Sequence, residues 1–281
     1  MTLRNGLLGV VVVSAVAVPW ASAHQVISER AVVTRAVPAS PGSTVSGASG
    51  ASGVAADGAP WTAGGLVART TGRVFFTLSG VDYACSASTV GGASPSVVVT
   101  AAHCVSDGAG AWATNWRFIP GYANGQAPYG VYRAVAFYVA KGWDSGADRD
   151  DDVAFVTTRP ATSGGGDVGT VVGEQPISFG PRDGTASVFG YPAMQPYDGS
   201  QLDYCAGPVS PDPYGGADAG LSCAMTEGDS GGPWLSSFDP STGAGTITAV
   251  TSFKYSDDSA DLYSANLGPV AEALYLRAEH P

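Results

Sequence analysis

The chain has 281 residues, with 24 acidic and 13 basic side chains and a formal net charge of −11. A strongly acidic chain repels phosphate groups, so nucleic acids and anionic membranes are not expected partners. Only 13% of the residues are charged, whereas 44% are hydrophobic and 39 are glycine. This composition excludes a disordered chain, argues against a helical bundle and predicts a β-rich protein with many loops.

Residues 1–23 have the three parts of an export signal. Arg4 supplies a positive charge, residues 7–18 form an apolar run, and residues 21–23 read Ala-Ser-Ala, a small-residue cleavage pattern. The apolar run is too short to span a bilayer, which favours a signal peptide over a membrane anchor. We therefore expect a secreted, extracellular protein. Its four cysteines then lie where disulfides persist, and four thiols allow three pairings.

Residues 24–60 differ in composition from the rest of the chain. Ala, Ser, Gly and Pro make up 22 of these 37 residues, too polar and small a set to bury a core. The segment is either a flexible linker or a pro-segment removed on maturation, and both interpretations stay open. Ordered structure is expected to begin near Trp61, so that residues 61–281 form the folded domain.

The folded domain is predicted to consist mainly of short strands. Runs of β-branched and aromatic residues alternate with Gly, Pro, Asn and Asp, and these runs cover 73–78, 96–100, 131–139, 153–157, 185–189 and 246–253. Such spacing is typical of a sandwich or of barrels rather than of a parallel sheet. One helix is predicted after Gly268 and Pro269. Its apolar face would contain Val270, Ala271, Leu274 and Ala278.

Two segments contain residues suited to nucleophilic catalysis. Residues 97–104, Val-Val-Val-Thr-Ala-Ala-His-Cys, form an apolar strand that ends at His103, the only histidine inside the folded domain apart from the penultimate residue. Residues 227–234, Glu-Gly-Asp-Ser-Gly-Gly-Pro-Trp, place Ser230 in a turn whose glycines leave room for a substrate. A serine hydroxyl needs a base to remove its proton, and His103 is the candidate.

A catalytic imidazole also needs a carboxylate on its second ring nitrogen. Asp152 immediately precedes the apolar residues 153–156 and could turn inward, although Asp150 and Asp151 compete because strand register decides which side chain faces the core. The backbone N–H groups of Gly228 and Ser230 have the right relation to the nucleophile to bind a developing oxyanion.

The segments 100–104 (Thr-Ala-Ala-His-Cys), 152–155 (Asp-Val-Ala-Phe) and 228–233 (Gly-Asp-Ser-Gly-Gly-Pro) resemble the three signatures of trypsin/chymotrypsin-type serine proteases, in that family's order. The resemblance covers the chain from about Trp61 to its end. It implies an all-β fold of two packed antiparallel β-barrels, with the site in the crevice between them. It also implies a secreted, monomeric serine endopeptidase that needs no cofactor or metal, acts on proteins or peptides, and forms an acyl-enzyme.

The resemblance implies further features around these motifs. A disulfide between Cys85 and Cys104 would lie beside His103, which leaves Cys205 and Cys223 as the second pair. The residues around Cys223, and Gly-Tyr-Pro at 190–192, are similar to the bacterial glutamyl-endopeptidase branch rather than to mammalian digestive relatives.

Substrate specificity is predicted from the positions where the family builds its pocket. The floor, six residues before the serine, is Ala224, and the wall contains Ser252, Phe253 and Lys254. A neutral methyl group at the floor predicts poor cleavage after Arg or Lys. We expect a preference for uncharged side chains, with acidic ones as the second choice if the Lys254 ammonium points into the pocket.

Some alternatives stay open at this point. Asp229 would either accept a newly freed amino terminus, as in family members activated by cleavage, or only hydrogen-bond its own turn. The acidic run 148–152 is a solvated turn or, less in keeping with its spacing, a Ca²⁺ site. A catalytically silent binding module with the same fold is the alternative function. An α/β-hydrolase esterase fits poorly because its serine precedes the acid and the histidine.

Overall fold

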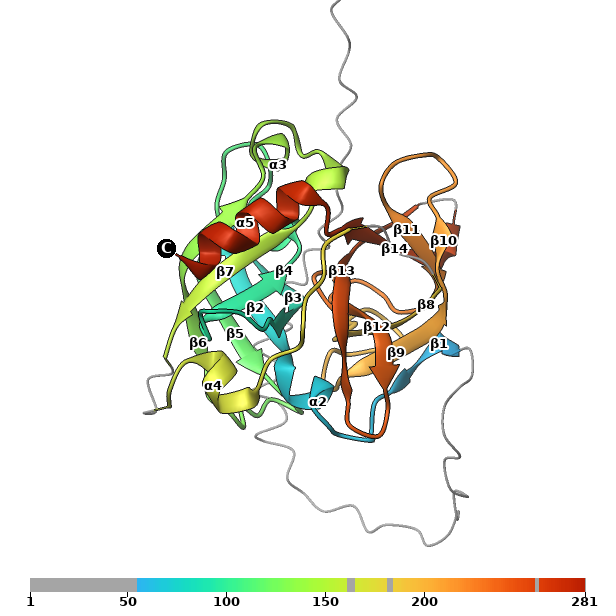
Figure 1. Ribbon diagram of the computed structural model, residues 1–281, viewed down its shortest axis with the longest axis horizontal. Helices are drawn as coiled ribbons and strands as arrows, with labels where there is room; N and C mark the ends of the chain where they lie inside the picture. Colours follow the sequence, from blue (N-terminus) through green and yellow to red (C-terminus); the bar gives the residue numbers. More distant parts are fainter. Residues whose placement is uncertain (1–54, 161–164, 181–183, 256–257, 281) are drawn as a thin grey trace, which may run out of the picture.

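The computed structural model describes residues 55–160, 165–180, 184–255 and 258–280. The predicted signal peptide and most of the predicted linker or pro-segment lie outside these residues. The described chain forms two β units that pack side by side (Figure 1), and strands are the main regular secondary structure of both units. The predicted all-β class is therefore confirmed.

The first unit is a closed barrel in the order β2, β3, β4, β7, β6 and β5. Its strands are β2 (Thr71–Leu78), β3 (Val81–Thr89), β4 (Val97–Thr100), β5 (Thr114–Pro120), β6 (Tyr132–Val139) and β7 (Ala154–Arg159). Successive side chains of a strand point to opposite faces, and β4 shows the consequence. Val98 lies in the barrel interior, while Val97 and Val99 belong to a second cluster that includes residues of both units.

The second unit is an eight-stranded sheet in the order β1, β9, β8, β12, β13, β14, β11 and β10. Its strands are β1 (Ala55–Pro60), β8 (Thr185–Gly190), β9 (Asp203–Pro208), β10 (Ser210–Pro211), β11 (Ala219–Ser222), β12 (Pro233–Asp239), β13 (Ala244–Tyr255) and β14 (Asp258–Asn266). Among the described residues its ladder does not close into a barrel, so the prediction of two barrels holds in detail only for the first unit.

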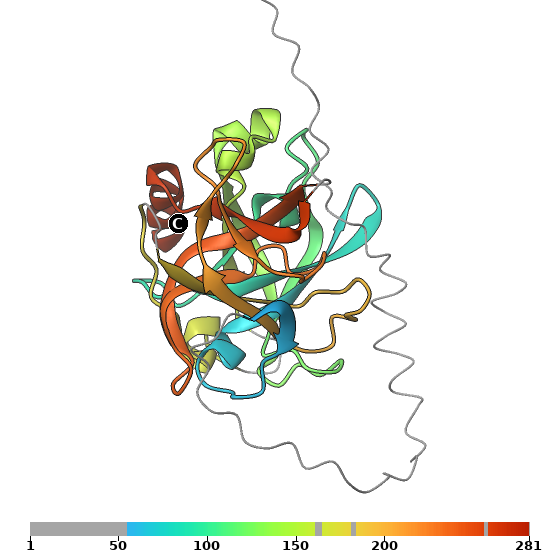
Figure 2. The same ribbon diagram turned by 90° about the vertical axis from the view of Figure 1, so that its right-hand side faces the viewer.

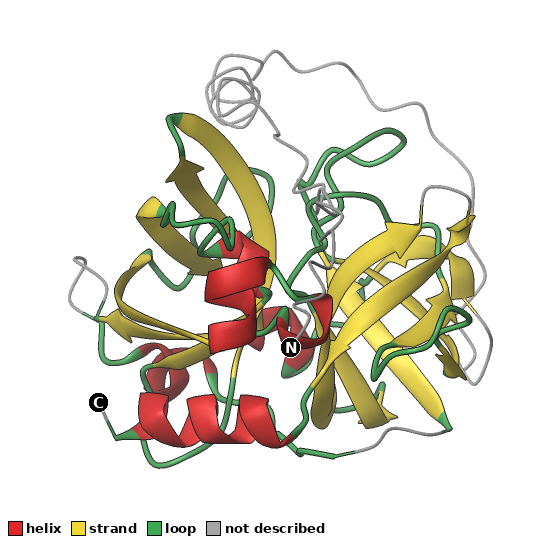
Figure 3. Ribbon diagram, turned by 90° about the horizontal axis from the view of Figure 1, so that it is seen from above, coloured by secondary structure: helices red, strands yellow, loops and turns green. Residues whose placement is uncertain are grey.

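Short helices connect the strands, and one longer helix ends the fold. They are α2 (Val67–Thr70), η1 (Ala102–Cys104), α3 (Lys141–Gly146), η2 (Arg149–Asp151), α4 (Val168–Val172) and α5 (Pro269–Glu279), where η denotes a 3₁₀ turn. Figure 3 shows two separate groups of strands, with the helices gathered beside the left-hand group. In the part of the chain that the structure describes, no helix has the length and apolar character needed to cross a membrane.

The terminal helix α5 joins the two units. It follows β14 of the second sheet but packs on β6 and β7 of the first barrel (Figures 1 and 2). Ala271, Leu274 and Ala278 are buried as predicted, whereas Val270 is 51% exposed. Glu279, predicted to lie off the apolar face, is buried and accepts a hydrogen bond from the Ser94 N–H at 2.9 Å. This bond offsets part of the cost of burying its carboxylate, whose Oε1 has no hydrogen-bond partner among the described residues.

The fold begins earlier than the sequence predicts. Strand β1 begins at Ala55, six residues before the expected start at Trp61. It pairs with β9 through Ala59↔Tyr204 and Pro60↔Asp203. Trp61 then anchors this edge, because its indole meets the rings of Phe189, Tyr204 and Phe238 at 5.2 to 5.4 Å. The ordered domain therefore includes Ala55–Pro60, which the sequence predicts to be part of the linker or pro-segment.

Each of the two units contains one disulfide. Cys85 is bonded to Cys104 in the first, and Cys205 to Cys223 in the second, which is the pairing that the resemblance implied. Their sequence separations are 19 and 18 residues. Loops of this size stabilise a fold by about 3 kcal/mol each in the chain-entropy model.

We therefore expect each double alanine variant, Cys85→Ala with Cys104→Ala or Cys205→Ala with Cys223→Ala, to lose about 3 kcal/mol in the free energy of unfolding. Denaturant unfolding measures this loss, and peptide mapping without reductant checks the pairing. A peptide that links Cys104 to Cys223 would contradict it.

Candidate active site

His103 lies directly after the buried strand β4, in the turn η1, and is 3% exposed. The next residue, Cys104, is bonded to Cys85 of β3, so the turn is fixed to the barrel. The Trp143 ring lies 6.4 Å from the imidazole, and its indole N–H donates to the Ser106 carbonyl at 3.1 Å. The imidazole is thus held in a buried setting by covalent, aromatic and polar contacts.

Asp152 reaches His103 from the turn before β7 and is fully buried. Its carboxylate accepts hydrogen bonds from the His103 backbone N–H and from ring atom Nδ1, both at 2.8 Å, and from the Ser252 hydroxyl. Because a carboxylate only accepts, Nδ1 carries the ring proton. The lone pair of the neutral imidazole is then on Nε2.

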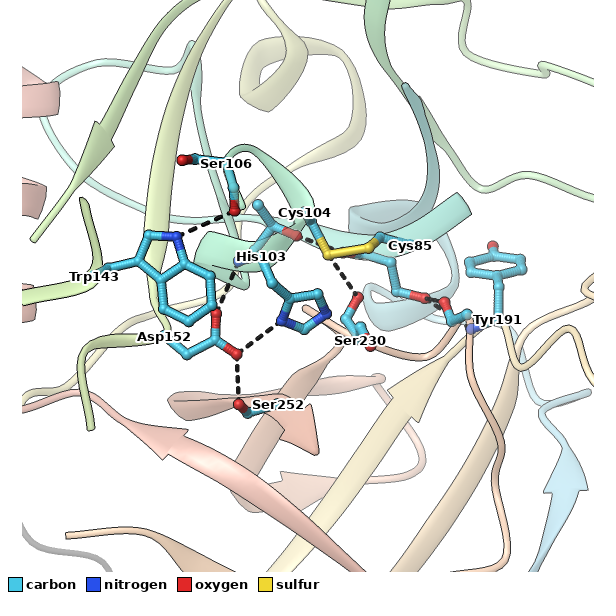
Figure 4. Close-up of a disulfide and its surroundings, with 12 residues drawn as sticks. Cys85, His103, Cys104, Ser106, Trp143, Asp152, Tyr191, Ser230 and Ser252 are labelled. Atoms are coloured by element: carbon cyan, nitrogen blue, oxygen red, sulfur yellow. Dashed lines mark hydrogen bonds and ion pairs between the residues drawn. A yellow bond between two sulfur atoms is a disulfide. The ribbon is translucent and has the colours of Figure 1, made fainter. Parts of the chain in front are cut away.

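Ser230 lies on the other side of the imidazole ring from Asp152 (Figure 4). It comes from the second unit, in the loop before β12, and is half-buried. Its carbonyl oxygen accepts from the Ser86 N–H of β3 at 2.7 Å. The Cys104 sulfur lies 3.8 Å from the same oxygen, a contact without a proton because this sulfur is in the disulfide. The structure therefore brings the three predicted catalytic residues together from both units.

The turn around Ser230 leaves two of its backbone N–H groups without a protein partner in the described part of the chain. The Glu227 carbonyl accepts from the Ala193 N–H at 2.7 Å, and the Asp229 carbonyl accepts from the Gly232 N–H at 2.8 Å. In a trans peptide the N–H points opposite to the carbonyl, so the N–H groups of Gly228 and Ser230 point away from these partners. Neither has a hydrogen-bond partner among the described residues. Gly228 has φ +104°, which excludes ordinary side chains here.

Asp229 is buried directly beside the nucleophile, and its Oδ2 has no hydrogen-bond partner among the described residues. Burial raises the pKa of this carboxyl to about 7, while the positive charge of Lys254 acts in the opposite direction. One interpretation of Asp229 is that its side chain only hydrogen-bonds its own turn. That interpretation leaves the buried Oδ2 without a partner among the described residues.

The predicted pocket residues lie in different settings. Ala224 is exposed, and the Lys254 ammonium donates to the carbonyl of the neighbouring Cys223. Phe253 is half-buried beneath the Arg149 guanidinium, whose central carbon lies 4.4 Å from the ring centre. Ser252 is buried and turns its hydroxyl to Asp152, so its side chain supports the carboxylate instead of the pocket.

The acidic run before Asp152 is a turn. Asp148 caps η2 by accepting a hydrogen bond from the Asp150 N–H at 3.2 Å, and the Asp150 side chain is exposed. Burial and the neighbouring acids raise the pKa of Asp151. Only Asp152 of this run bonds to His103, which supports the predicted strand register.

Within the described ranges, one group of His, Cys, Asp and Glu side chains is close enough to share a metal ion: Cys85, His103 and Cys104. Both sulfurs belong to the disulfide and are not thiolates, so this group does not fit a metal.

Comparison with known proteins identifies the family. The family model described as Trypsin matches residues 57–267. The chain belongs to the trypsin family. The structure of protease Anisep from Arthrobacter nicotinovorans is 38% identical, covers 76% of this chain and 96% of its own, and has a TM-score of 0.71. The thermostable serine protease AL20 from an extremophilic microorganism is 34% identical, with coverages of 76% and 98% and a TM-score of 0.71.

Two further matches are more distant or shorter. A Glu endopeptidase structure shares the fold at 18% identity, with a TM-score of 0.64 and coverages of 80% of this chain and 97% of its own. A curated relative from Bacillus subtilis (strain 168), named Extracellular metalloprotease, is 34% identical over 98 residues. That match spans 35% of this chain and only 31% of the relative.

The raised pKa of Asp229 predicts a pH-dependent stability. An aspartic acid of an unfolded chain titrates near pH 4, whereas the native carboxyl has a pKa of about 7. Between these values the native protein binds a proton that the unfolded chain has lost, so this group's contribution to stability falls as the pH rises through the window.

Asp229→Asn, compared with Asp229 in a Ser230→Ala background that prevents autolysis, should remove this dependence. The unfolding temperature of the Asn variant, relative to the parent, should increase from pH 4 to pH 7. A difference that stays constant over this range would contradict the raised pKa.

Proposed function

We propose that the protein is a secreted serine endopeptidase that cleaves peptide bonds through an acyl-enzyme on Ser230. The observation that carries the proposal is the pair of hydrogen bonds that His103 donates to the Asp152 carboxylate. It fixes the ring and its tautomer, so that the basic Nε2 faces the nucleophile. The two disulfides and the predicted signal peptide support secretion.

The steps follow from this geometry. The Ser230 hydroxyl gives its proton to Nε2 of His103 while its oxygen attacks the substrate carbonyl carbon. The N–H groups of Gly228 and Ser230 donate hydrogen bonds to the carbonyl oxygen and stabilise the negative charge that forms on it. Collapse of this intermediate breaks the C–N bond, and His103 returns the proton to the leaving amine. Water then hydrolyses the ester by the same sequence, and Asp152 stabilises the imidazolium in both halves.

Ser230→Ala and His103→Ala should each lower kcat/KM for a peptide substrate by about 10⁴-fold or more. The three residues of the triad act together, so the loss of either one removes most of the contribution of all three. Asp152→Asn should be nearly as damaging. Asp151→Asn is the matched control: it removes the neighbouring carboxylate, which does not bond to His103, and should stay within about twofold.

Covalent labelling separates the protease from a silent binding module. A serine-directed phosphonate should add its mass to the wild-type protein and not to Ser230→Ala. If the folded wild-type protein takes up no label and Ser230→Ala hydrolyses peptide as well as wild type does, the proposal is wrong.

The setting of Lys254 bears on the choice between uncharged and acidic substrates. Its side chain is half-buried, and its ammonium donates to the carbonyl of Cys223, the residue before the exposed Ala224. This contact supports a place for acidic side chains among the substrates. A positive charge here repels Arg and Lys and attracts a carboxylate, so we propose cleavage after acidic and uncharged side chains.

Matched peptides with Glu, Leu or Arg before the scissile bond test this specificity. We expect Glu and Leu to be cleaved and Arg to be cleaved poorly, and Lys254→Ala should lower the Glu-to-Leu ratio of kcat/KM by about tenfold. Lys141→Ala, which removes the exposed lysine of α3, is the control. Dominant cleavage after Arg would contradict the assignment of Ala224 to the pocket floor.

A further inference from the structure

Ser86 connects the first barrel to the oxyanion turn through its side chain. It is fully buried on β3. Its hydroxyl donates to the Gly228 carbonyl at 2.9 Å and accepts from the Tyr191 N–H at 2.9 Å. Its backbone N–H donates to the Ser230 carbonyl, as described above. One residue of the first unit therefore contacts the turn at two of its four consecutive carbonyls.

The four carbonyls from Glu227 to Ser230 each have one fixed partner. Glu227 is held by Ala193, Gly228 and Ser230 by Ser86, and Asp229 by Gly232. The Ser86 hydroxyl also holds Tyr191, two residues before Ala193, and so acts on the partner of the Glu227 carbonyl. The peptide planes on both sides of Gly228 are thus set, directly or through the 191–193 segment, by one hydroxyl group.

We propose that Ser86 is a positioning residue for the oxyanion hole, an inference that rests on the proposed protease activity. Gly228 has the wide backbone freedom of glycine, and at φ +104° only its surroundings keep its peptide planes in place. Without the Ser86 hydroxyl, the Gly228 carbonyl and the Tyr191 N–H are left buried and unpaired. Rotation of the turn to find new partners moves the Gly228 N–H away from the substrate oxygen.

The strand offers a matched control two residues further on. Ser88 is also fully buried on β3, but its hydroxyl donates only to the adjacent Thr89 carbonyl at 3.2 Å. Loss of that hydroxyl removes a hydrogen bond within β3 and removes no contact with the oxyanion turn. A general packing effect would appear in both variants, whereas loss of oxyanion binding appears in one.

The experiment compares Ser86→Ala and Ser88→Ala with wild type in kcat, KM and affinity for a peptide aldehyde, which forms a tetrahedral adduct on the serine. Removing an oxyanion donor outright costs about 10²- to 10³-fold in kcat, so misplacing one through Ser86→Ala should cost about 10- to 100-fold. KM should stay within about threefold, and the aldehyde should lose affinity by a factor similar to the loss in kcat. Ser88→Ala should resemble wild type.

Two results would overturn the proposal: a folded Ser86→Ala with wild-type kcat and aldehyde affinity, or equal losses in Ser86→Ala and Ser88→Ala. If Ser86→Ala does not fold, Ser86→Thr and Ser86→Val replace it, because this pair has the same shape and differs in the hydroxyl. A kcat ratio of Thr to Val near one would then refute the role. If wild type is no more active than Ser230→Ala, the proposed function itself has failed, a result that is distinct from these.

Discussion

The hydrogen bond from the Ser86 N–H to the Ser230 carbonyl, 2.7 Å long, joins the two β units at the point where the site requires it. His103 and Asp152, the proposed base and its carboxylate, belong to the first unit, whereas Ser230, the proposed nucleophile, belongs to the second. A displacement of about 1 Å between reacting groups can cost about 10²-fold in rate, so the contact between the units has to be rigid. Two features provide that rigidity. One is the hydrophobic cluster that contains Val97, Val99 and residues of both units. The other is α5, which follows the second sheet and packs on the first barrel.

Two buried acids beside the site illustrate how the surroundings decide the behaviour of a carboxyl group. Asp152 accepts three hydrogen bonds, two of them from His103, and these compensate its burial. Asp229 is equally buried, but its Oδ2 lacks a partner among the described residues, and its pKa rises to about 7. The first acid is suited to hold a fixed orientation. The second changes its protonation state with pH, and a nearby positive charge lowers its pKa.

The sequence predicts those parts of the molecule whose signal is local. The valine run of β4 and the Gly-Asp-Ser-Gly turn were recognisable because their residue types and spacing define a strand and a tight loop. Strand β1 was missed because Ala and Gly have little intrinsic strand preference, and its pairing with β9 decides its conformation. Val270 and Glu279 differ from prediction for a similar reason, since the surface of the first barrel decides which face of α5 is buried.

The supporting serines could not be found by such reasoning. Ser252 lies 100 residues from its partner Asp152, and Ser86 lies 142 residues from Gly228. Nothing near either serine in the sequence distinguishes its hydroxyl from those of other serines in strands. Only the packing of the two units brings these donors to their acceptors. The sequence therefore predicts the candidate residues His103, Asp152 and Ser230, but not the groups that hold them in place.

Cys85 and Ser86 are neighbours on β3. Because successive side chains of a strand point to opposite faces, these two residues contact different parts of the site. Cys85 points into the barrel interior, where its disulfide fixes the turn that carries His103. Ser86 points to the opposite face and holds the turn that carries Ser230. The register of β3 against β2 runs without a shift from Thr71↔Ser88 to Leu78↔Val81. Because a slip of one residue exchanges the two faces, it would separate the cysteine from its partner and the serine from the turn at once. The pairing of β2 with β3 therefore positions His103 and the turn around Ser230 together.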